Sequence, residues 1–357
     1  MKKFVALPVQ VIEIPEGVVL KRGTSKVMIR GAKAADSVRI VLDATRGDGA
    51  SVGELRRLLT RSVGKQADSI ISNLQHRRLL VSKDRKTSPA NDQEGIMDSL
   101  YWQFGGTNGE VRQRLNKVHL AIIGVNHISR QLAISLMSCN YNNFTVLDHP
   151  QFRNFRMFDK TGRLKKGCWP TFCTRPQRWK ARHTGSLGNC VIVTSDFGGK
   201  QALREWNALC LDRALHFMPV ILDNLVGHVG PMVIPGATAC YECLLCRQRS
   251  QSVFSETEML IDCAAYDGQE IMAFHPCMAS IVGELAAFEI VRFYGNILPD
   301  RKVGWLLEVD LLATSMTRRP VIKVPRCPAC SPLRNSSQAN TFNNPISEWA
   351  TEWVKGQ

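Results

Sequence analysis

Two cysteine pairs constrain the fold of this chain more than any other feature of its sequence. Each has the Cys-x-x-Cys spacing, the first at Cys240 and Cys243 and the second at Cys327 and Cys330. Two such knuckles can present four thiolates to one tetrahedral zinc, and four protein ligands leave no open position for a substrate. We therefore expect a structural zinc. Cys246 extends the first pair and could substitute as a ligand, and a redox dithiol is the alternative use of either pair.

The remaining composition bears on the compartment. Twelve cysteines could form a disulfide framework, but such frameworks belong to small secreted chains, and this chain has 357 residues and no signal-peptide pattern. No run of about eighteen apolar residues offers a membrane span. These observations predict a cytoplasmic protein with no membrane partner. The formal charge of +15 favours an acidic partner of some kind without choosing among them.

Residues 111–332 alternate between apolar strand patterns and helical patterns. The strand VHLAIIG ends at Gly124, FTVLD ends at Asp148, and NCVIVTSD ends at Asp196, with a helical pattern between the first two. FMPVILD follows after a further helix and ends at Asp223. This order predicts an α/β domain with a doubly wound, Rossmann-like parallel sheet.

Residues 1–88 form a separate pattern of strands and helices. Strands are predicted over 9–14, 18–22 and 26–31, then helices over about 35–44, 51–60 and 65–78, and a short strand LLVSK. Ser51 and Glu54 form a capping box at the second helix. The order predicts a winged-helix module, which commonly binds DNA. Residues 89–110 are predicted to be a linker, and 333–357 a polar tail ending in Trp349 and Trp353.

The first turn of the α/β domain departs from a nucleotide-binding turn. Only Gly124 remains of the G-x-G-x-x-G pattern, and Asn126 and His127 would crowd a triphosphate. This argues against binding of ATP and magnesium at the turn. Asp148 and Asp196 end strands, where carboxylates can hold ribose hydroxyls or magnesium, and either could equally cap a helix.

Residues 151–183 interrupt the alternation with ten Lys or Arg, one acid and six Phe or Trp. One interpretation is a solvated loop whose aromatic residues pack locally. The other is a contact surface for an anionic partner, because arginine and aromatic side chains suit stacking and phosphate contact.

Over roughly residues 98–332 the sequence resembles the ThiF-like adenylating proteins, a family that includes ubiquitin-activating enzymes and the enzyme that adenylates the microcin C precursor. The segments that carry the resemblance are YWQFGG, VLDHPQFRNFR, VIVTSDF, GPMVIPGATACYECL and CPAC. The resemblance implies that the four cysteines of the two pairs bind zinc. It also implies a nucleotide site in which Gly124 forms the turn, Asp148 takes the ribose, Asn154 and Arg156 assist the phosphates, and Asp196 holds magnesium.

A winged-helix module in front of such a domain resembles the leader-peptide-binding partners of YcaO-type cyclodehydratases, which make thiazolines and oxazolines. In that group the module adds the leader of a precursor peptide as a strand to a sheet edge. The residues expected to bind it here are one edge strand and the facing side of the third helix: Lys26, Val27, Met28, Ile29, Arg30, Ile70, Asn73, Leu74 and Arg77. The module has eighteen Lys or Arg against eight Asp or Glu, which would attract an acidic leader.

The leading hypothesis is a recognition subunit that has no catalysis of its own and delivers a precursor peptide to a YcaO-type enzyme, in a homodimer or a hetero-complex. The first alternative is an ATP-dependent enzyme that adenylates a peptide carboxylate. The second is a winged-helix DNA-binding regulator, although nucleic acid is not the partner we expect.

Overall fold

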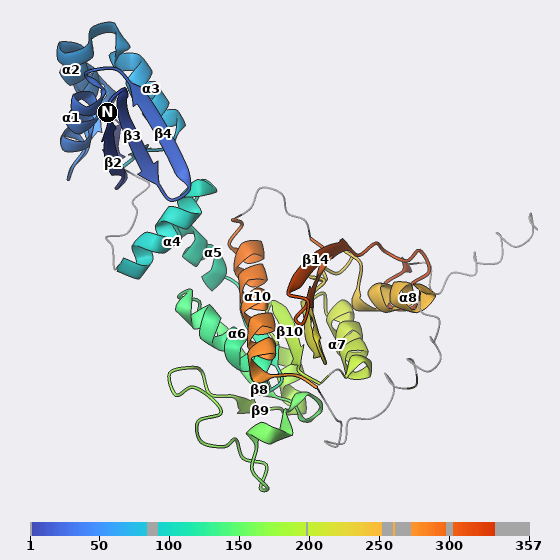
Figure 1. Ribbon diagram of the computed structural model, residues 1–357. Coiled ribbons are helices and arrows are strands. Elements are labelled where there is room, and N and C mark those ends of the chain that lie inside the picture. The colour runs from blue at the N-terminus through green and yellow to red at the C-terminus, as the bar shows by residue number, and fades with distance from the viewer. Residues whose placement is uncertain are drawn as a thin grey trace, which may run out of the picture. The chain divides into compact units, whose positions relative to one another are not determined.

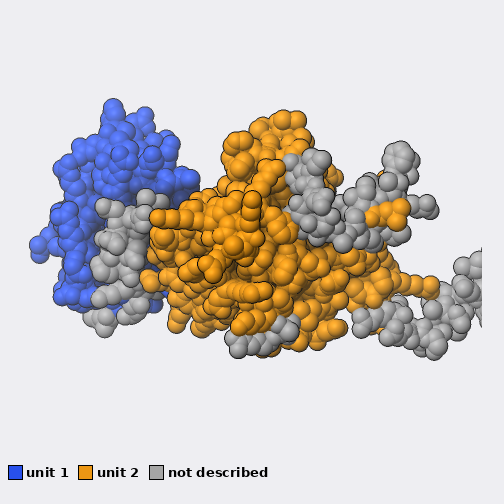
Figure 2. Space-filling view, turned by 90° about the horizontal axis from the view of Figure 1, so that it is seen from below, with its two compact units in different colours: residues 1–111 blue, residues 112–357 orange. Residues whose placement is uncertain are grey.

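The computed structural model describes residues 2–83, 92–197, 199–251, 260, 273–297 and 303–332. The chain divides into two compact units, Met1–Val111 and Arg112–Gln357, which we call unit 1 and unit 2 (Figure 2). The predicted tail over 333–357 and the first residues of the predicted linker lie outside the described residues. No helix within these ranges combines the length and apolarity needed to cross a bilayer.

Unit 1 contains two small antiparallel sheets and three helices packed around one core (Figure 1). The sheets have the orders β5-β1-β6 and β2-β3-β4. Their strands are β1 (Lys3–Ala6), β2 (Gln10–Ile14), β3 (Gly17–Arg22), β4 (Ser25–Arg30), β5 (Ala50–Ser51) and β6 (Leu80–Ser82). The helices are α1 (Ala34–Ala44), α2 (Val52–Val63) and α3 (Ala67–His76).

Local sequence explains where these elements begin. Ser51 caps α2, accepting from the N–H of Glu54, while the Glu54 carboxylate accepts from the N–H of Ser51. The predicted capping box is thus confirmed. The apolar faces of α2 and α3 bury Leu55, Leu59 and Ile71 against the strands.

Two further helices follow, α4 (Asp92–Gln103) and α5 (Asn108–Asn116). They occupy part of the stretch for which the sequence predicts a linker. Tyr101 and Trp102 are buried, and the Trp102 indole donates to the carbonyl of Arg78 at 2.7 Å. The end of α4 is therefore fastened to the core of unit 1.

Unit 2 is built on an eight-stranded sheet with the order β14-β13-β12-β11-β10-β7-β8-β9. The five strands β9, β8, β7, β10 and β11 run parallel, and β12 to β14 are antiparallel. The strands are β7 (Leu120–Ile123), β8 (Phe144–Asp148), β9 (Gln177–Arg178), β10 (Cys190–Ser195), β11 (His216–Asp223), β12 (Val226–Val229), β13 (Trp305–Asp310) and β14 (Ser315–Pro320). The predicted parallel sheet is confirmed.

Helices cover both faces of this sheet (Figure 1). They are α6 (His127–Ser138), α7 (Lys200–Asp212), α8 (Tyr241–Gln251) and α10 (Pro276–Tyr294). Helices α6 and α10 pack against each other so closely that a side chain at Gly283 would meet the carbonyl of Ile128 at 2.7 Å. Leu203 and Trp206 of α7 pack on the other face, with Ile123 and Val193. Both faces are buried, which explains the continuous apolar runs of the central strands.

The chain order places a topological switch point between β7 and β10. From β7 the chain passes to β8 on one side and then returns to β10 on the other. In open α/β sheets, ligands bind beyond the carboxyl ends of the strands at such a point. Gly124 follows β7 there, and Asp196 follows β10.

Candidate functional site

Strand β4 has an open edge. Among the described strands it pairs only with β3. Gly31 donates its N–H to the carbonyl of Glu16 at 2.9 Å, which continues the ladder by one pair. Because hydrogen bonding alternates along an antiparallel strand, the N–H and C=O groups of Lys26, Met28 and Arg30 point away from β3. These groups are available to an added strand.

A groove of about 870 Å³ lies beside this edge, between β4 and α3. Met28 is 49 % exposed, and Ile29 and Ile70 are half-buried, so the groove has an apolar strip. Five of the nine predicted peptide-binding residues line the groove: Met28, Ile29, Arg30, Ile70 and Asn73.

The other four predicted residues lie differently. Val27 and Leu74 are buried in the core of unit 1, where they support the strand and the helix from beneath. Lys26 is exposed on β4 and Arg77 at the end of α3. Neither of these two exposed side chains is among those lining the groove.

Positive charge surrounds the groove. Arg30 lies 3.6 Å from Glu16, both largely exposed, so water screens this pair strongly. The ammonium of Lys33 donates to the carbonyl of Ser62 at 3.3 Å, and Lys65 is exposed on the same lining. A ligand with carboxylates would meet complementary charge here.

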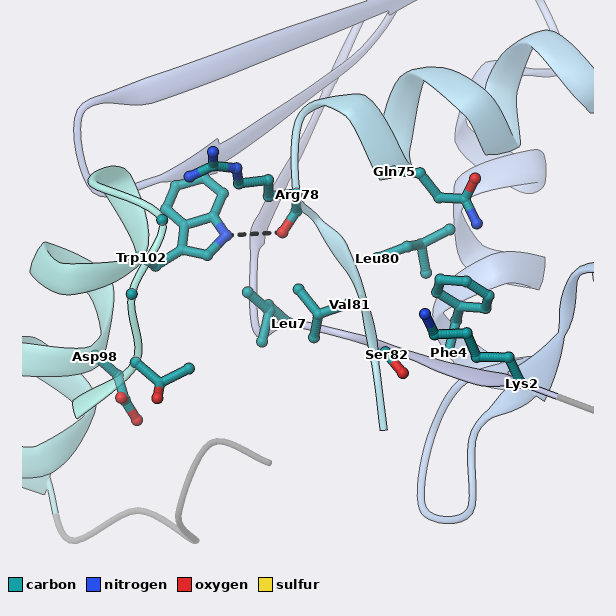
Figure 3. Close-up of a pocket in the computed structure, with 13 residues that line it drawn as sticks. Lys2, Phe4, Leu7, Gln75, Arg78, Leu80, Val81, Ser82, Asp98 and Trp102 are labelled. Carbon is teal, nitrogen blue, oxygen red and sulfur yellow. Dashed lines mark hydrogen bonds between the residues drawn. The ribbon is translucent and has the colours of Figure 1, made fainter. Parts of the chain in front are cut away.

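A second cavity of unit 1, of about 320 Å³, straddles β6 (Figure 3). Figure 3 shows Trp102 and Asp98 of α4 on one side, Leu7 and Val81 in the middle, and Phe4 beyond them. Arg22 lies over the Trp102 ring at 5.3 Å. Asp98 accepts from the N–H of Asn108 at 2.8 Å. The polar groups of this wall thus hold α4 and the turn after it in place.

The turn after β7 is filled by protein groups. Gly124 has φ +110°, and a Cβ there would meet the Thr194 carbonyl at 2.7 Å. Asn126 caps α6 and is fully buried, and its amide nitrogen donates to the carbonyls of Thr194 at 2.8 Å and Phe152 at 3.2 Å. The side chain that replaces the second glycine thus cross-links three segments at the place where a backbone would approach phosphates.

Asp148, at the end of β8, is held by Arg153. The guanidinium donates from Nε to Oδ1 at 2.5 Å and from Nη2 to Oδ2 at 2.6 Å, and it lies 4.7 Å from the Phe158 ring centre. The hydrogen bonds to Asp148 raise the pKa of Arg153. Both carboxylate oxygens that would take ribose hydroxyls already accept from an arginine. Arg153 and Asn126 thus fill the turn with hydrogen bonds within the protein.

Asp196 and Asn154 are brought together at the switch point. Oδ2 of Asp196 accepts from the Asn154 amide at 2.9 Å and from the N–H of His127 at 3.1 Å. Oδ1 of Asp196 is buried without a hydrogen-bond partner among the described residues. Burial raises the pKa of Asp196 and lowers that of His127.

Arg156 is exposed near this pair. Its N–H donates to Asn154 at 3.1 Å, and its charge, with that of Arg130, also lowers the pKa of His127. The predicted set of Gly124, Asp148, Asn154, Arg156 and Asp196 thus lies around one turn, with Asp148 paired to a residue that sequence reasoning did not consider. The acid-to-arginine spacing of five residues was the available signal for that pair.

The two cysteine pairs converge in unit 2. Their four sulfur atoms lie within 4.8 Å of one another, with separations of 3.9 Å from Cys240 to Cys243, 3.6 Å from Cys240 to Cys327 and 3.5 Å from Cys243 to Cys330. Zinc–sulfur bonds of about 2.3 Å in a tetrahedron place sulfur atoms about 3.8 Å apart. The N–H of Val324 donates to the Cys243 sulfur at 3.4 Å. This set fits one tetrahedral metal ion.

No family model and no curated protein matches this sequence. Solved structures with a similar fold include the microcin C7 biosynthetic enzyme MccB of Escherichia coli. MccB with AMPCPP and MccA has a TM-score of 0.64 at 14 % identity, over 92 % of this chain and 99 % of MccB. MccB with ATP has a TM-score of 0.64 at 13 % identity, with the same coverage.

A heterocyclase in complex with substrate and cofactor has a TM-score of 0.61 at 15 % identity. The match covers 93 % of this chain but only 40 % of the heterocyclase chain. At these identities the likeness concerns the fold. This chain therefore shares the fold of MccB over 92 % of its length. The shared part goes beyond residues 98–332, over which the sequence resembles the ThiF-like family.

Proposed function

We propose that this protein captures the leader of a precursor peptide on the open edge of β4 and delivers the peptide to a separate YcaO-type cyclodehydratase. The observation that carries the proposal is the pairing of that edge with the groove beside α3. Charged residues on an edge strand can also serve only to prevent aggregation. An adjoining groove of about 870 Å³ with an apolar strip favours a ligand over that simpler role.

The chemistry of the edge suggests how the leader binds. The leader's backbone would pair with Lys26, Met28 and Arg30, and strand addition of this kind derives affinity from main-chain hydrogen bonds. An apolar side chain of the leader would enter between Met28 and Ile70. Acidic side chains would lie near the positive rim, with Arg77 and Asn73 as polar contacts along α3.

The comparisons support a peptide ligand. MccB has been solved with N-formylated MccA, and the heterocyclase with its substrate. Because the Asn126 amide and the Asp148–Arg153 pair fill the turn of unit 2, we assign the chemistry to another polypeptide. We interpret unit 1 as a winged-helix recognition module and unit 2 as the scaffold, stabilised by zinc bound to the four clustered cysteines.

An adenylating enzyme is the second candidate, favoured by one observation. Oδ1 of Asp196 has no hydrogen-bond partner within the part of the chain that the structure describes. It is a buried oxygen of the kind that binds magnesium, at the switch point of the sheet. The Asp148–Arg153 pair and the buried Asn126 amide oppose it, since both occupy positions that a nucleotide needs. Purified protein should therefore release no pyrophosphate from ATP in the presence of bound peptide.

The test begins with a random peptide library displayed on phage and selected on the full-length protein. The Kd of a selected peptide is then measured by fluorescence anisotropy for the wild type, for Met28→Pro and for Glu13→Pro. Proline at 28 removes an outward N–H without removing a bond to β3, and proline at 13 does the same on β2, at the opposite edge.

We expect at least tenfold weaker binding for Met28→Pro and unchanged binding for Glu13→Pro. Equal affinity of both variants would refute capture at β4. Pyrophosphate release by the wild type alone would instead support the adenylating enzyme.

A further inference from the structure

The segment 151–183, which we call the basic loop, holds most of the surplus charge of the chain. Its ten Lys or Arg and single Asp give it nine of the fifteen net positive charges in 33 residues. Eight of these cations are exposed: Arg156, Lys160, Arg163, Lys165, Lys166, Arg175, Arg178 and Lys180. The leader-binding proposal makes no use of them, because they belong to unit 2.

The basic loop is a folded structure with buried residues of its own. Met157, Phe158, Trp169 and Cys173 are at most 8 % exposed. Phe158 and Leu164 form an isolated bridge, and the Trp169 indole donates to the carbonyl of Thr174 at 3.0 Å. The cations are therefore presented from a fixed scaffold.

The only acid of the loop, Asp159, is hydrogen-bonded within its own turn. The Asp159 carboxylate accepts from the backbone N–H groups of Thr161 and Arg163 and from the Thr161 hydroxyl, at 2.6 to 3.0 Å. These bonds lower the pKa of Asp159 and close a local turn. The carboxylate has a structural role, and the surrounding charge faces solvent.

Two aromatic rings stand among the cations without burial. Phe172 is 65 % exposed and Phe155 is 43 % exposed. Loops of this length with little secondary structure are uncommon in compact domains, and those that are folded are usually functional. A merely solvated loop accounts for the charge but gives no reason to expose the rings beside it.

We propose that the basic loop binds a single-stranded nucleic acid, with the cations contacting phosphates and Phe155 and Phe172 stacking on bases. Protein–nucleic acid interfaces are far more positively charged than protein–protein interfaces, and an excess of ten cations over one acid matches the former. Exposed rings stack on unpaired bases, whereas the described part of the loop has no α-helix that could enter a major groove. This inference departs from the sequence-based expectation that nucleic acid is not a partner.

The test measures binding of fluorescein-labelled 20-nucleotide RNA and single-stranded DNA of mixed sequence to the full-length protein, between 50 and 200 mM salt. One variant replaces Lys160, Lys166 and Arg175 with Gln. A matched control replaces three exposed cations elsewhere, Lys21, Arg57 and Lys117, with Gln. A third variant is Phe172→Ala, and unlabelled polyglutamate of equal charge serves as a competitor.

We expect saturable binding whose affinity falls as the salt concentration rises. In a plot of log K against log salt concentration, each phosphate contact contributes about −0.7 to the slope. The loop variant, which removes three cations, should therefore reduce the magnitude of this slope by about two. The control should keep the wild-type slope. Phe172→Ala should bind about fivefold more weakly or worse, as stacking on a ring predicts. Equal losses in the control, or full competition by polyglutamate with no effect of Phe172→Ala, would overturn the proposal and indicate a generic acidic partner.

Discussion

The guanidinium of Arg153 donates a hydrogen bond to each carboxylate oxygen of Asp148. The Arg153 side chain is only 18 % exposed and the Asp148 side chain only 12 %. Removing one member of a pair with this little access to water leaves a poorly solvated charge. We expect Arg153→Gln to lower the free energy of unfolding by about 3 kcal/mol. Urea unfolding measures the change, with the exposed Arg163→Gln of the same loop as control. Equal stability of the two variants would show that the pair does not stabilise unit 2.

The cysteine cluster predicts a metal content. The purified protein should contain one zinc per chain by elemental analysis, and Cys243→Ser should lose it and unfold at a lower temperature. Cys246→Ser is the matched control, because Cys246 lies on the same helix but outside the cluster. Loss of zinc in both variants, or retention in both, would contradict the assignment of ligands.

Asn126 predicts a large loss of stability on truncation. Asn126→Ala removes the cap of α6, a change of about 1 kcal/mol. It also leaves the buried carbonyls of Thr194 and Phe152 without this donor, which adds about 1–3 kcal/mol. Asn116→Ala, at an exposed position in α5, should change stability little. Similar unfolding curves for the two variants would show that the amide cross-link is dispensable.

His149 predicts a pH dependence. Burial among Phe152, Trp179 and Trp206 lowers the pKa of His149 to about 4. The charge of Asp148 raises this pKa and the charge of Arg153 lowers it, and both effects are smaller than that of burial. The unfolded chain protonates this imidazole near pH 6.5. The unfolded chain therefore binds this proton more readily than the folded chain does. As a result, the free energy of unfolding falls as pH drops from about 6.5 towards 4.

In His149→Phe the free energy of unfolding should depend less on pH between about 4 and 6.5 than it does in the wild type. Above pH 7 its dependence on pH should be the same as that of the wild type. Chemical denaturation at several pH values measures it. The exposed His76→Gln should retain the wild-type dependence. An unchanged acid slope in His149→Phe would mean that the imidazole is protonated as easily in the fold as in the unfolded chain.

Much of this architecture could be predicted because each signal was local. The Ser51 and Glu54 cap, the buried strand runs and the spacing of the cysteine pairs all depend on neighbouring residues. Helix α4 was hidden, because its sequence DQEGIMDSLYWQ begins with polar residues and a glycine inside a stretch that resembles a linker. Tyr101 and Trp102 at its end are buried by contact with the rest of unit 1.

In the candidate sites, too, local features could be predicted from the sequence and contacts between distant segments could not. The edge position of β4 followed from the order of the strands. Only the fold shows that Val27 faces the core of unit 1 while Met28 lines the groove. The substitution at Asn126 was visible in the sequence as a missing glycine. Its bonds to segments 26 and 68 residues away could come only from the fold.

The central claim is that a peptide adds to β4, and amide exchange measured residue by residue tests it most directly. In the free protein the outward amides of Lys26, Met28 and Arg30 should exchange quickly, while those of Val27 and Ile29 are protected by β3. Binding of a selected peptide should slow exchange at the three outward amides and leave β2 unchanged. Protection elsewhere in unit 1, with these three amides still exchanging quickly in the saturated complex, would contradict the account.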